Sequence, residues 1–430
     1  LHPRVRRQRQ MCIRDRSYGG NFIITAQNPT GPWSEPHYIE GADGIDPSLF
    51  FDEDGTCYYI GTHPNPAGCQ YDGDWYIWIQ ELDIENMKLV GEVHNVWNGA
   101  MRNIIWPEGP HLYKIGEYYY IMHAEGGTGP DHAVTVCRSK NVYGPYENNF
   151  CNPILTHRHL GRKYPICYVG HADLVKTIND EWYMVMLAVR PLEGYTTMGR
   201  ETFLARVEWE NDWPVVNPGV GRLTDTVEIN LPKWTAYTAE SNEYVFSTMG
   251  QLPPEFMVLR NADKSHYSLE KGKGLLMLFD THTLKEQASP SYLALRQKHH
   301  HFMAKALLDV SNLSEDKRAG IAYVQNNLYN LRVEVNGKMA EVILCEKGTD
   351  RRVISMPLQG SNPLEVSLEV DGLSAAVIIE GQKSPEVDIR TLSTEAAGGF
   401  TGCTVGLYAV ADTENTDCAC FKRFSYSEAL

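Results

Sequence analysis

Three ionisable side chains head three similar segments and could share acid–base chemistry. The segments begin at Asp46 (DPSLFFDEDGTCYYIG), Glu108 (EGPHLYKIGEYYYIM) and His171 (HADLVKTINDEWYMVM), at steps of 62 and 63 residues. Each segment runs from its head through an apolar stretch and a turn into an aromatic pair. Carboxylates and imidazoles are the groups that most often transfer protons in enzymes. The repeat therefore predicts one site built from residues far apart in the sequence.

The elements that would position these side chains are short strands. Apolar and polar residues alternate along the chain, turn signals recur roughly every 8–12 residues, and no convincing amphipathic helix is present. A four-stranded unit of this length is typical of a β-propeller blade, and its innermost strand lines the central channel. A second repeat, a strand that runs into a Gly-Pro-aromatic corner, occurs at 24–36 and 136–148. We therefore expect the three heads to converge on the axis of an all-β propeller.

The sequence predicts three regions: a foreign-looking basic leader (1–16), a partial propeller (17–228) and a β-sandwich (229–430), with a linker near 231–244. The leader holds six arginines and one acid, Asp15, and the chain starts with Leu. We interpret it as an extension that replaces the true amino terminus. The propeller region holds about three blades, whereas a closed ring needs roughly four or more. An incomplete propeller is the expectation.

Composition narrows the function. The formal charge of −15 disfavours nucleic acid as a partner, because phosphates would be repelled. No apolar run approaches the roughly 20 residues of a membrane span. The ten cysteines form no CxxC pair and no dense framework, which favours a reducing, cytoplasmic compartment. Secretion stays open, because a signal peptide would precede the residues at hand.

Nine motifs, in order, resemble glycoside hydrolase family 43, in its β-xylosidase/α-L-arabinofuranosidase branch with a carboxy-terminal concanavalin-like β-sandwich. The resemblance runs from about residue 19 to the end. The motifs are GIDPSLFFDEDG (44–55), WIQELD (78–83), PEGPHLYK (107–114), AEGGTG (124–129), HAVTVCRS (132–139), GHADLV (170–175), GRETFLARVEW (199–209), WPVVNPGVGRL (213–223) and GGFTGCTVGLYA (398–409).

The resemblance implies a five-bladed propeller and an inverting glycosidase. It assigns the general acid to Glu108. It also assigns to Asp46 the carboxylate that orients this acid and keeps it protonated by like-charge repulsion. The general base of the family is an Asp of the first blade, which the sequence does not reach. Because a positioned base typically contributes about 10²–10⁴-fold, we expect impaired activity.

Three further residues are expected to bind substrate. In the family, the arginine of the GRETFL motif, here Arg200, reaches the terminal sugar with its forked donors. His171 is expected near the axis, orienting substrate or contacting a Ca²⁺ ion through water, since calcium prefers oxygen ligands. Phe400 is expected at the tip of a sandwich loop that closes the pocket, where its ring could stack on a sugar. No cofactor is expected to be required.

Other histidines carry weaker signals. His299, His300 and His301 are consecutive in an expected strand, so alternate side chains point to opposite faces and one compact metal site is not expected. His157 and His159 are expected in a loop at the rim of the propeller.

Three functions remain open from the sequence. The leading one is an exo-acting β-1,4-xylosidase that releases xylose from short xylo-oligosaccharides. The second is an α-L-arabinofuranosidase, because xylose and arabinofuranose can present similar hydroxyl groups to one pocket. The third is a non-catalytic sugar-binding or inactive fragment. Expected partners are a small xylo-oligosaccharide or arabinoside, no nucleic acid and no membrane, with self-association into a homo-oligomer left open.

Overall fold

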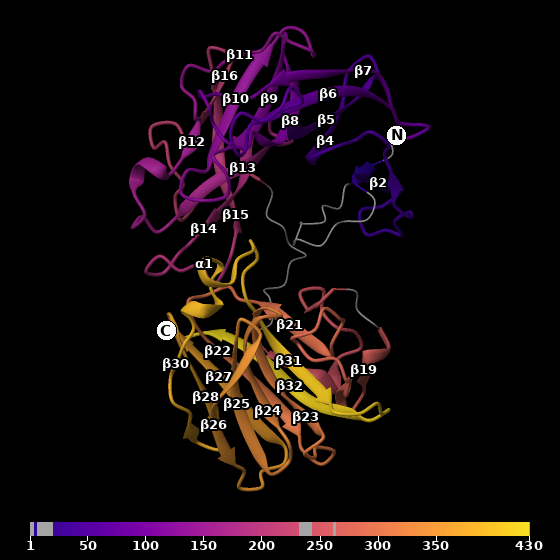
Figure 1. The fold of residues 1–430 in the computed structure, drawn as a ribbon, viewed down its shortest axis with the longest axis vertical. Coiled ribbons are helices and arrows are strands. Elements are labelled where there is room, and N and C mark those ends of the chain that lie inside the picture. The colour runs from indigo at the N-terminus through magenta and orange to yellow at the C-terminus, as the bar shows by residue number, and fades with distance from the viewer. Residues whose placement is uncertain (1–3, 7–19, 232–242, 261–263, 430) are drawn as a thin grey trace. The chain divides into compact units, whose positions relative to one another are not determined.

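The computed structural model describes residues 4–6, 20–231, 243–260 and 264–429 (Figure 1). Most of the predicted leader, including Asp15, and most of the predicted linker lie outside these residues. The chain forms two units, Leu1–Val189 with Glu201–Lys233, and Arg190–Arg200 with Trp234–Leu430. The sequence placed residues 190–200 in the propeller region, whereas their contacts group them with the second unit. Within the described ranges, no helix has the length and apolar character needed to cross a membrane.

The first unit consists of antiparallel sheets made from strands that are consecutive in the chain. Three sheets hold four or more strands and follow a short first one. The strands are β1 (Arg4–Arg6), β2 (Phe22–Ala26) and β3 (His37–Tyr38); β4 (Ile45–Phe51), β5 (Cys57–Pro64), β6 (Trp75–Asp83) and β7 (Lys88–Trp97); β8 (Glu108–Ile115), β9 (Tyr118–Glu125), β10 (Ala133–Ser139), β11 (Glu147–Asn148) and β12 (Leu155–Thr156); and β13 (Cys167–Lys176), β14 (Trp182–Val189), β15 (Glu201–Glu210) and β16 (Trp213–Val216).

The aromatic pairs of the repeat explain how each sheet packs. They lie on the second strand of each sheet, and the second member of each pair, Tyr59, Tyr120 or Tyr183, is at most 3% exposed. Because neighbouring residues of a strand point to opposite faces, each pair covers both faces of its sheet. The repeat seen in the sequence is therefore a repeat of sheets.

The innermost strands of successive sheets lie side by side. Strand β4 contacts β8, and both β8 and β9 contact β13. Apolar clusters fill the spaces between sheets: one contains Ile60, Ile79 and Ile121, and the next contains Met122, Val169 and Met184. This arrangement is of the propeller type, as the sequence predicted. The five blades of a complete ring stay a prediction.

The second repeat also appears in the structure. Gly31 has φ 89° and Gly144 has φ 90°. In each turn the glycine N–H donates to a carbonyl three residues earlier, that of Asn28 or Asn141, at 2.9 Å. Only glycine adopts this left-handed backbone without a steric penalty, so the two corners use the same device.

The second unit is a sandwich of two antiparallel sheets, as predicted. The first sheet runs β19 (Tyr267–Glu270), β20 (Gly274–Leu278), β32 (Cys418–Glu428), β22 (His301–Asp309), β27 (Leu364–Asp371), β28 (Ser374–Ile379) and β29 (Gln382–Lys383), with β17 (Glu243–Val245) and β30 (Val387–Asp388) at its sides. The second runs β18 (Met257–Val258), β21 (Tyr292–Arg296), β31 (Thr404–Ala411), β23 (Lys317–Asn326), β24 (Tyr329–Val335), β25 (Met339–Glu346) and β26 (Thr349–Pro357).

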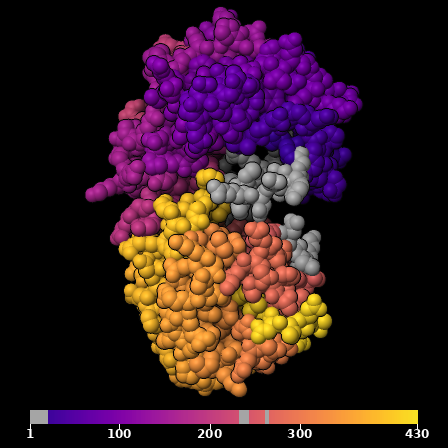
Figure 2. Space-filling view, in the orientation of Figure 1, coloured from indigo at the N-terminus to yellow at the C-terminus, as the bar shows by residue number. Residues whose placement is uncertain are grey.

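Alternating apolar residues from both sheets form the core of the sandwich. Phe302, Tyr323 and Phe424 are all fully buried in it. The residues coloured orange to yellow form one compact body in Figure 2. One short helix, α1 (Thr394–Ala397), and 3₁₀ turns at Arg158–Leu160, Phe246–Thr248, Lys264–His266 and Arg390–Leu392 complete the helical content of the described residues.

Tyrosine hydroxyls connect neighbouring sheets of the first unit. The Tyr113 hydroxyl, on β8, donates to Asp173 Oδ1 on β13 at 2.5 Å and accepts from the Leu174 N–H at 2.9 Å. Burial and the nearby Asp173 carboxylate raise the pKa of Tyr113 well above its usual value, so the phenol remains a donor. The Tyr119 hydroxyl, on β9, donates to Asp52 at 2.6 Å. These bonds fix the spacing between the strands that carry the ionisable heads.

We predict that Tyr113→Phe destabilises the first unit by about 1–2 kcal/mol, because the Leu174 N–H loses its acceptor. The free energy of unfolding from urea titrations would measure this loss. Tyr38→Phe is the matched control, because the Tyr38 side chain is 48% exposed and its hydroxyl makes no hydrogen bond within the described residues. Equal stabilities of the two variants would contradict the prediction.

Candidate active site

A β-bulge interrupts the first strand of all three repeated sheets at the same place. The register skips between Ile45 and Ser48 on β4, between Glu108 and His111 on β8, and between Gly170 and Asp173 on β13. An extra residue in one strand re-aims the side chains next to it. The three heads predicted from the sequence therefore lie at or beside a bulge.

One residue in each bulge adopts the left-handed conformation: Asp46 (φ 53°), Gly109 (φ 58°) and His171 (φ 53°). Aspartate and histidine are among the few residue types other than glycine enriched there. Asp46 and His171 thus occupy equivalent positions, and Glu108 precedes the third position by one residue. The repeat in the sequence aligned Glu108 itself with Asp46 and His171. In the structure the equivalent residue of this sheet is Gly109, so the sequence alignment is shifted by one residue there.

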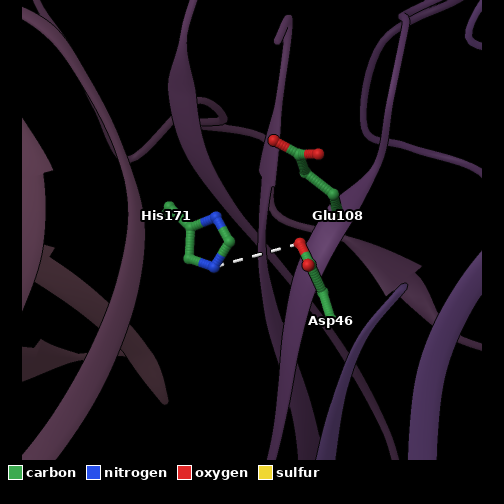
Figure 3. Close-up of side chains that lie close together, drawn as sticks. All are labelled: Asp46, Glu108 and His171. Atoms are coloured by element: carbon green, nitrogen blue, oxygen red, sulfur yellow. Dashed lines mark ion pairs between the residues drawn. The ribbon is translucent and has the colours of Figure 1, made fainter. Parts of the chain in front are cut away.

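The side chains of Asp46, Glu108 and His171 come together in one cluster (Figure 3). Their nearest carboxylate and imidazole atoms all lie within 4.8 Å of one another. His171 Nε2 is 4.0 Å from Asp46 Oδ2, and these side chains are 14% and 3% exposed. The convergence predicted from the sequence is therefore present. The cluster can hold and pass a proton between a half-buried carboxyl group and its neighbours.

Glycines allow the close packing of this cluster. A Cβ atom on Gly109 would lie 2.6 Å from His171 Nε2, so the ring rests directly against the β8 main chain. A Cβ atom on Gly170 would lie 2.4 Å from the His132 ring, and His132 Nδ1 is 2.9 Å from the Tyr168 carbonyl oxygen. The His171 ring and the strand that carries it are thus held from two sides.

The segment before Glu108 is fixed by hydrogen bonds to its main chain. Thr62 Oγ1 donates to the Pro107 carbonyl at 2.6 Å, and the Trp106 N–H donates to the Gly73 carbonyl at 2.8 Å. The Gly126 N–H donates to the Ile105 carbonyl at 2.9 Å. Residue Thr62 of β5 and the residues Gly73, before β6, and Gly126, after β9, therefore determine where Glu108 enters β8.

Two buried polar residues that the sequence reasoning missed support this segment. Glu125, fully buried, accepts the Ala100 N–H at 2.9 Å and lies 3.5 Å from His123 Nε2. His123 Nε2 is 2.9 Å from Thr135 Oγ1. The sequence does contain a signal for this pair. His123 and Glu125 are two residues apart in an apolar strand, so their side chains must lie on the same face of the sheet.

Arg200 and Phe400 lie together in the second unit. The Arg200 guanidinium stands over the Phe400 ring, 4.6 Å from its centroid, and the Arg200 N–H donates to the Phe400 carbonyl at 3.3 Å. Phe400 is 43% exposed, as expected for a loop tip. The sequence did not predict this cation–π contact. The substrate-binding roles of both residues stay predictions.

Residues 190–200 form a strap, the segment that leaves β14 and returns to β15 but packs on the sandwich. Thr196 donates twice to the Glu395 carboxylate, from N at 2.7 Å and from Oγ1 at 2.8 Å. The Cys403 N–H donates to the Thr197 carbonyl at 2.8 Å. Gly199 pairs with Thr401, where a Cβ atom would lie 2.1 Å from the Gly402 nitrogen. These bonds hold Arg200 next to Phe400.

The consecutive histidines have separate partners. His299 Nε2 is 3.8 Å from Glu428, and His301 Nδ1 is 2.6 Å from Asp371. In the part of the chain that the structure describes, the group of residues able to hold a metal is Asp46, Glu108 and His171. Calcium takes roughly six to eight oxygen ligands, so two carboxylates and an imidazole do not form a complete calcium site.

Comparisons with known proteins cover both units. A family model described as glycosyl hydrolases family 43 matches residues 7–214, and one described as beta xylosidase C-terminal concanavalin A-like domain matches residues 244–427. The first match begins inside the predicted leader.

Relatives match along most of the chain. A xylosidase/arabinosidase of Butyrivibrio fibrisolvens is 46% identical over 421 residues, 94% of this chain and 80% of the relative. A non-reducing end α-L-arabinofuranosidase of Bacteroides ovatus is 34% identical over 95% of this chain and 78% of its own length. The crystal structure of a xylan β-1,4-xylosidase from Bacillus halodurans superposes with a TM-score of 0.85 at 30% identity, covering 95% of this chain and 81% of that one.

We predict that Gly109→Ala destabilises the chain by about 1–3 kcal/mol more than Gly116→Ala does. Both glycines have similar left-handed φ values, 58° and 60°, so the backbone strain is matched. A Cβ atom on Gly116 meets nothing within 4 Å, whereas on Gly109 it meets the His171 ring. Urea titrations would measure the difference, and equal losses in the two variants would contradict the packing argument.

We predict that Glu395→Ala loosens the strap, because Thr196 loses two hydrogen bonds to a charged acceptor, each worth about 1.5–3 kcal/mol. Hydrogen exchange at the Thr196 and Cys403 amides would become faster than in the wild type. Glu414→Ala, at an exposed residue of the same unit, is the control and should leave exchange unchanged. Unaltered protection in Glu395→Ala would rule out this role.

Proposed function

Because the chain belongs to glycosyl hydrolase family 43, we propose that it is an inverting exo-β-1,4-xylosidase that releases xylose from xylo-oligosaccharides. Membership makes it a glycoside hydrolase of the xylosidase/arabinosidase group, with an oligosaccharide as substrate. The observation that carries the proposal is the cluster of Asp46, Glu108 and His171, whose polar atoms lie within 4.8 Å.

In this proposal, Glu108 is the general acid. It donates its proton to the glycosidic oxygen as the bond to the terminal xylose breaks, so that the leaving sugar departs as a neutral alcohol. Asp46 lies within 4.8 Å of Glu108. Repulsion between two carboxylates at this distance favours the state in which the pair keeps one proton, which is the proton the reaction uses.

Asp46 is too close to Glu108 to activate water on the opposite face of the sugar. An inverting enzyme separates acid and base by roughly 6.5–9.5 Å, whereas the cluster spans 4.8 Å. Asp46 therefore serves as the orienting and proton-retaining carboxylate. The family resemblance assigns the general base to a separate carboxylate, an Asp of the first blade.

A second candidate activity is α-L-arabinofuranoside hydrolysis. The names of two relatives favour it, the xylosidase/arabinosidase and the non-reducing end α-L-arabinofuranosidase. The same acid would serve both reactions, because both leaving groups require a proton. Arg200 would pair with hydroxyl groups of the terminal sugar, and Phe400 would cover its face.

Other parts of the proposal concern the surroundings of the reaction. Glycosidases of this family generally act without a cofactor. A calcium ion contacted by His171 through water, and self-association of the chain, stay predictions. We also propose a reducing compartment such as the cytoplasm, which the free state of the cysteines among the described residues supports.

We predict that Glu108→Gln reduces hydrolysis of xylobiose by about 10²–10⁴-fold and affects p-nitrophenyl β-xyloside much less. A sugar leaving group needs the proton of Glu108, whereas nitrophenolate leaves without one. Initial rates with both substrates, and with p-nitrophenyl α-L-arabinofuranoside, would measure the effect. Proton NMR of the first-formed xylose anomer would test inversion.

Glu117→Gln is the matched control, because Glu117 is on the same hairpin and its side chain is 78% exposed. It should leave all rates unchanged. Equal losses on xylobiose and the nitrophenyl substrate in Glu108→Gln would contradict the role as acid. Absence of hydrolysis with every substrate would contradict the activity of this chain and favour a sugar-binding role.

A further inference from the structure

A basic segment free of acids lies beside the cluster in the first unit. Residues 148–172 contain Arg158, Arg162 and Lys163 but no Asp or Glu, in a chain with 54 acids against 39 Lys and Arg. The segment leads from the third sheet into β13, which carries His171. A local positive charge on a protein of formal charge −15 points to an anionic ligand.

This segment borders a hollow of about 140 Å³. Its lining includes Arg158 and Arg162, the carboxylate residue Asp131, and Tyr168 at the start of β13. A water molecule occupies about 30 Å³ in the liquid, so the hollow has room for a group larger than a single ion. Neither arginine forms an ion pair with a carboxylate of the described residues.

The walls of the hollow are fixed before any ligand arrives. The Leu223 N–H donates to His157 Nε2 at 3.0 Å, and Nδ1 of the same ring lies 2.7 Å from the Ile166 carbonyl oxygen. Nε2 is therefore an acceptor, and Nδ1 carries the proton. Burial lowers the pKa of His157, which keeps the ring neutral. Cys167 Sγ is 3.0 Å from the Tyr164 carbonyl oxygen. A preformed site loses little entropy on binding.

The charges of the lining select among anions. Two guanidinium groups and one carboxylate leave one net positive charge, which matches a monoanion. Guanidinium groups bind carboxylates through paired hydrogen bonds, whereas the Asp131 carboxylate can accept hydrogen bonds from sugar hydroxyls. Asp131 repels an anion in proportion to its charge, so a phosphate dianion is disfavoured more than a monoanion. A sugar that carries both a carboxylate and hydroxyl groups fits this set.

The hollow is close enough to the cluster to share one oligosaccharide. Tyr168 lines the hollow and His171 belongs to the cluster, and both are on β13. Three residues of chain span at most about 11 Å. This separation is on the scale of one or two sugar rings, so the Tyr168 side of the hollow lies within the length of a short oligosaccharide from the cluster.

We propose that the hollow between Arg158, Arg162 and Asp131 binds the carboxylate of a uronic acid branch on the oligosaccharide substrate. This inference rests on the proposed function, because it assigns the anion to the same substrate that occupies the cluster. It adds a specificity determinant that the motifs of the sequence did not reveal.

Calorimetric titration of the full chain at low salt would test the inference. The ligands are xylotriose, the same trisaccharide with one glucuronic acid branch, free glucuronate and inorganic phosphate. We expect the branched ligand to bind at least tenfold more tightly than xylotriose, and the advantage to shrink in high salt. The double variant Arg158→Gln with Arg162→Gln should lose the advantage and keep its affinity for xylotriose.

Arg206→Gln is the control, because Arg206 is a half-exposed arginine of the same unit that does not line the hollow. It should preserve the advantage. Equal affinities for the two trisaccharides, or an advantage that survives in the double variant, would overturn the inference and leave the proposed function standing. Phosphate binding as tight as glucuronate would overturn the assignment to a sugar acid.

Failure of both trisaccharides to bind would instead count against the proposed function. In that case, the affinity of the chain for free glucuronate alone tests the hollow as an anion site. An anion site at the hollow requires that glucuronate binds the wild type and does not bind the variant with both Arg158→Gln and Arg162→Gln. Glucuronate binding that persists in this double variant would refute the site.

Discussion

A left-handed residue in a β-bulge near the start of the innermost strand is the constraint on which the site of the first unit depends. Asp46 and His171 adopt this conformation despite their side chains, and Gly109 adopts it on the strand of Glu108. Such backbone costs about 1–3 kcal/mol at a non-glycine residue, and the surrounding sheets must supply that energy. The hydrogen bonds of Tyr113 and Thr62 and the packing of His171 against Gly109 do so locally.

The same arrangement explains why charged groups can be held so close together. The cluster combines carboxylates with an imidazole in surroundings where water has limited access, and a second buried carboxylate, Glu125, supports the loop that enters β8. Rigid strands, rather than flexible loops, carry Asp46, Glu108 and His171. In the proposed mechanism, carboxylates fixed at this separation retain one proton between them, and proton retention is what a general acid requires.

Much of the fold could be predicted, because the aromatic pairs and ionisable heads recur with the sheets themselves. Convergence of Asp46, Glu108 and His171 followed from that period. The one-residue offset of Glu108 could not be predicted, since a bulge changes backbone register without changing the apolar pattern. The strap was also missed: Thr196 and Glu395 are 199 residues apart, and such a long-range pair leaves no trace in local composition. The position of His157 at the rim stays a prediction. Its burial was not predicted, and hydrogen bonds from both ring nitrogens to the backbone make that burial possible.

The strap also determines how the chain can be divided. Because residues 190–200 belong to the second unit while β14 and β15 belong to the first, the polypeptide passes between the units more than once. The sandwich is thus a discontinuous domain, and a fragment cut within the linker would lack part of it. Such a fragment would leave the amides of Thr394 and Cys403 without the carbonyl groups of Thr196 and Thr197. During synthesis, residues 190–200 must also wait for some 200 further residues before their partners exist, so the strap is among the last parts of the molecule to fold.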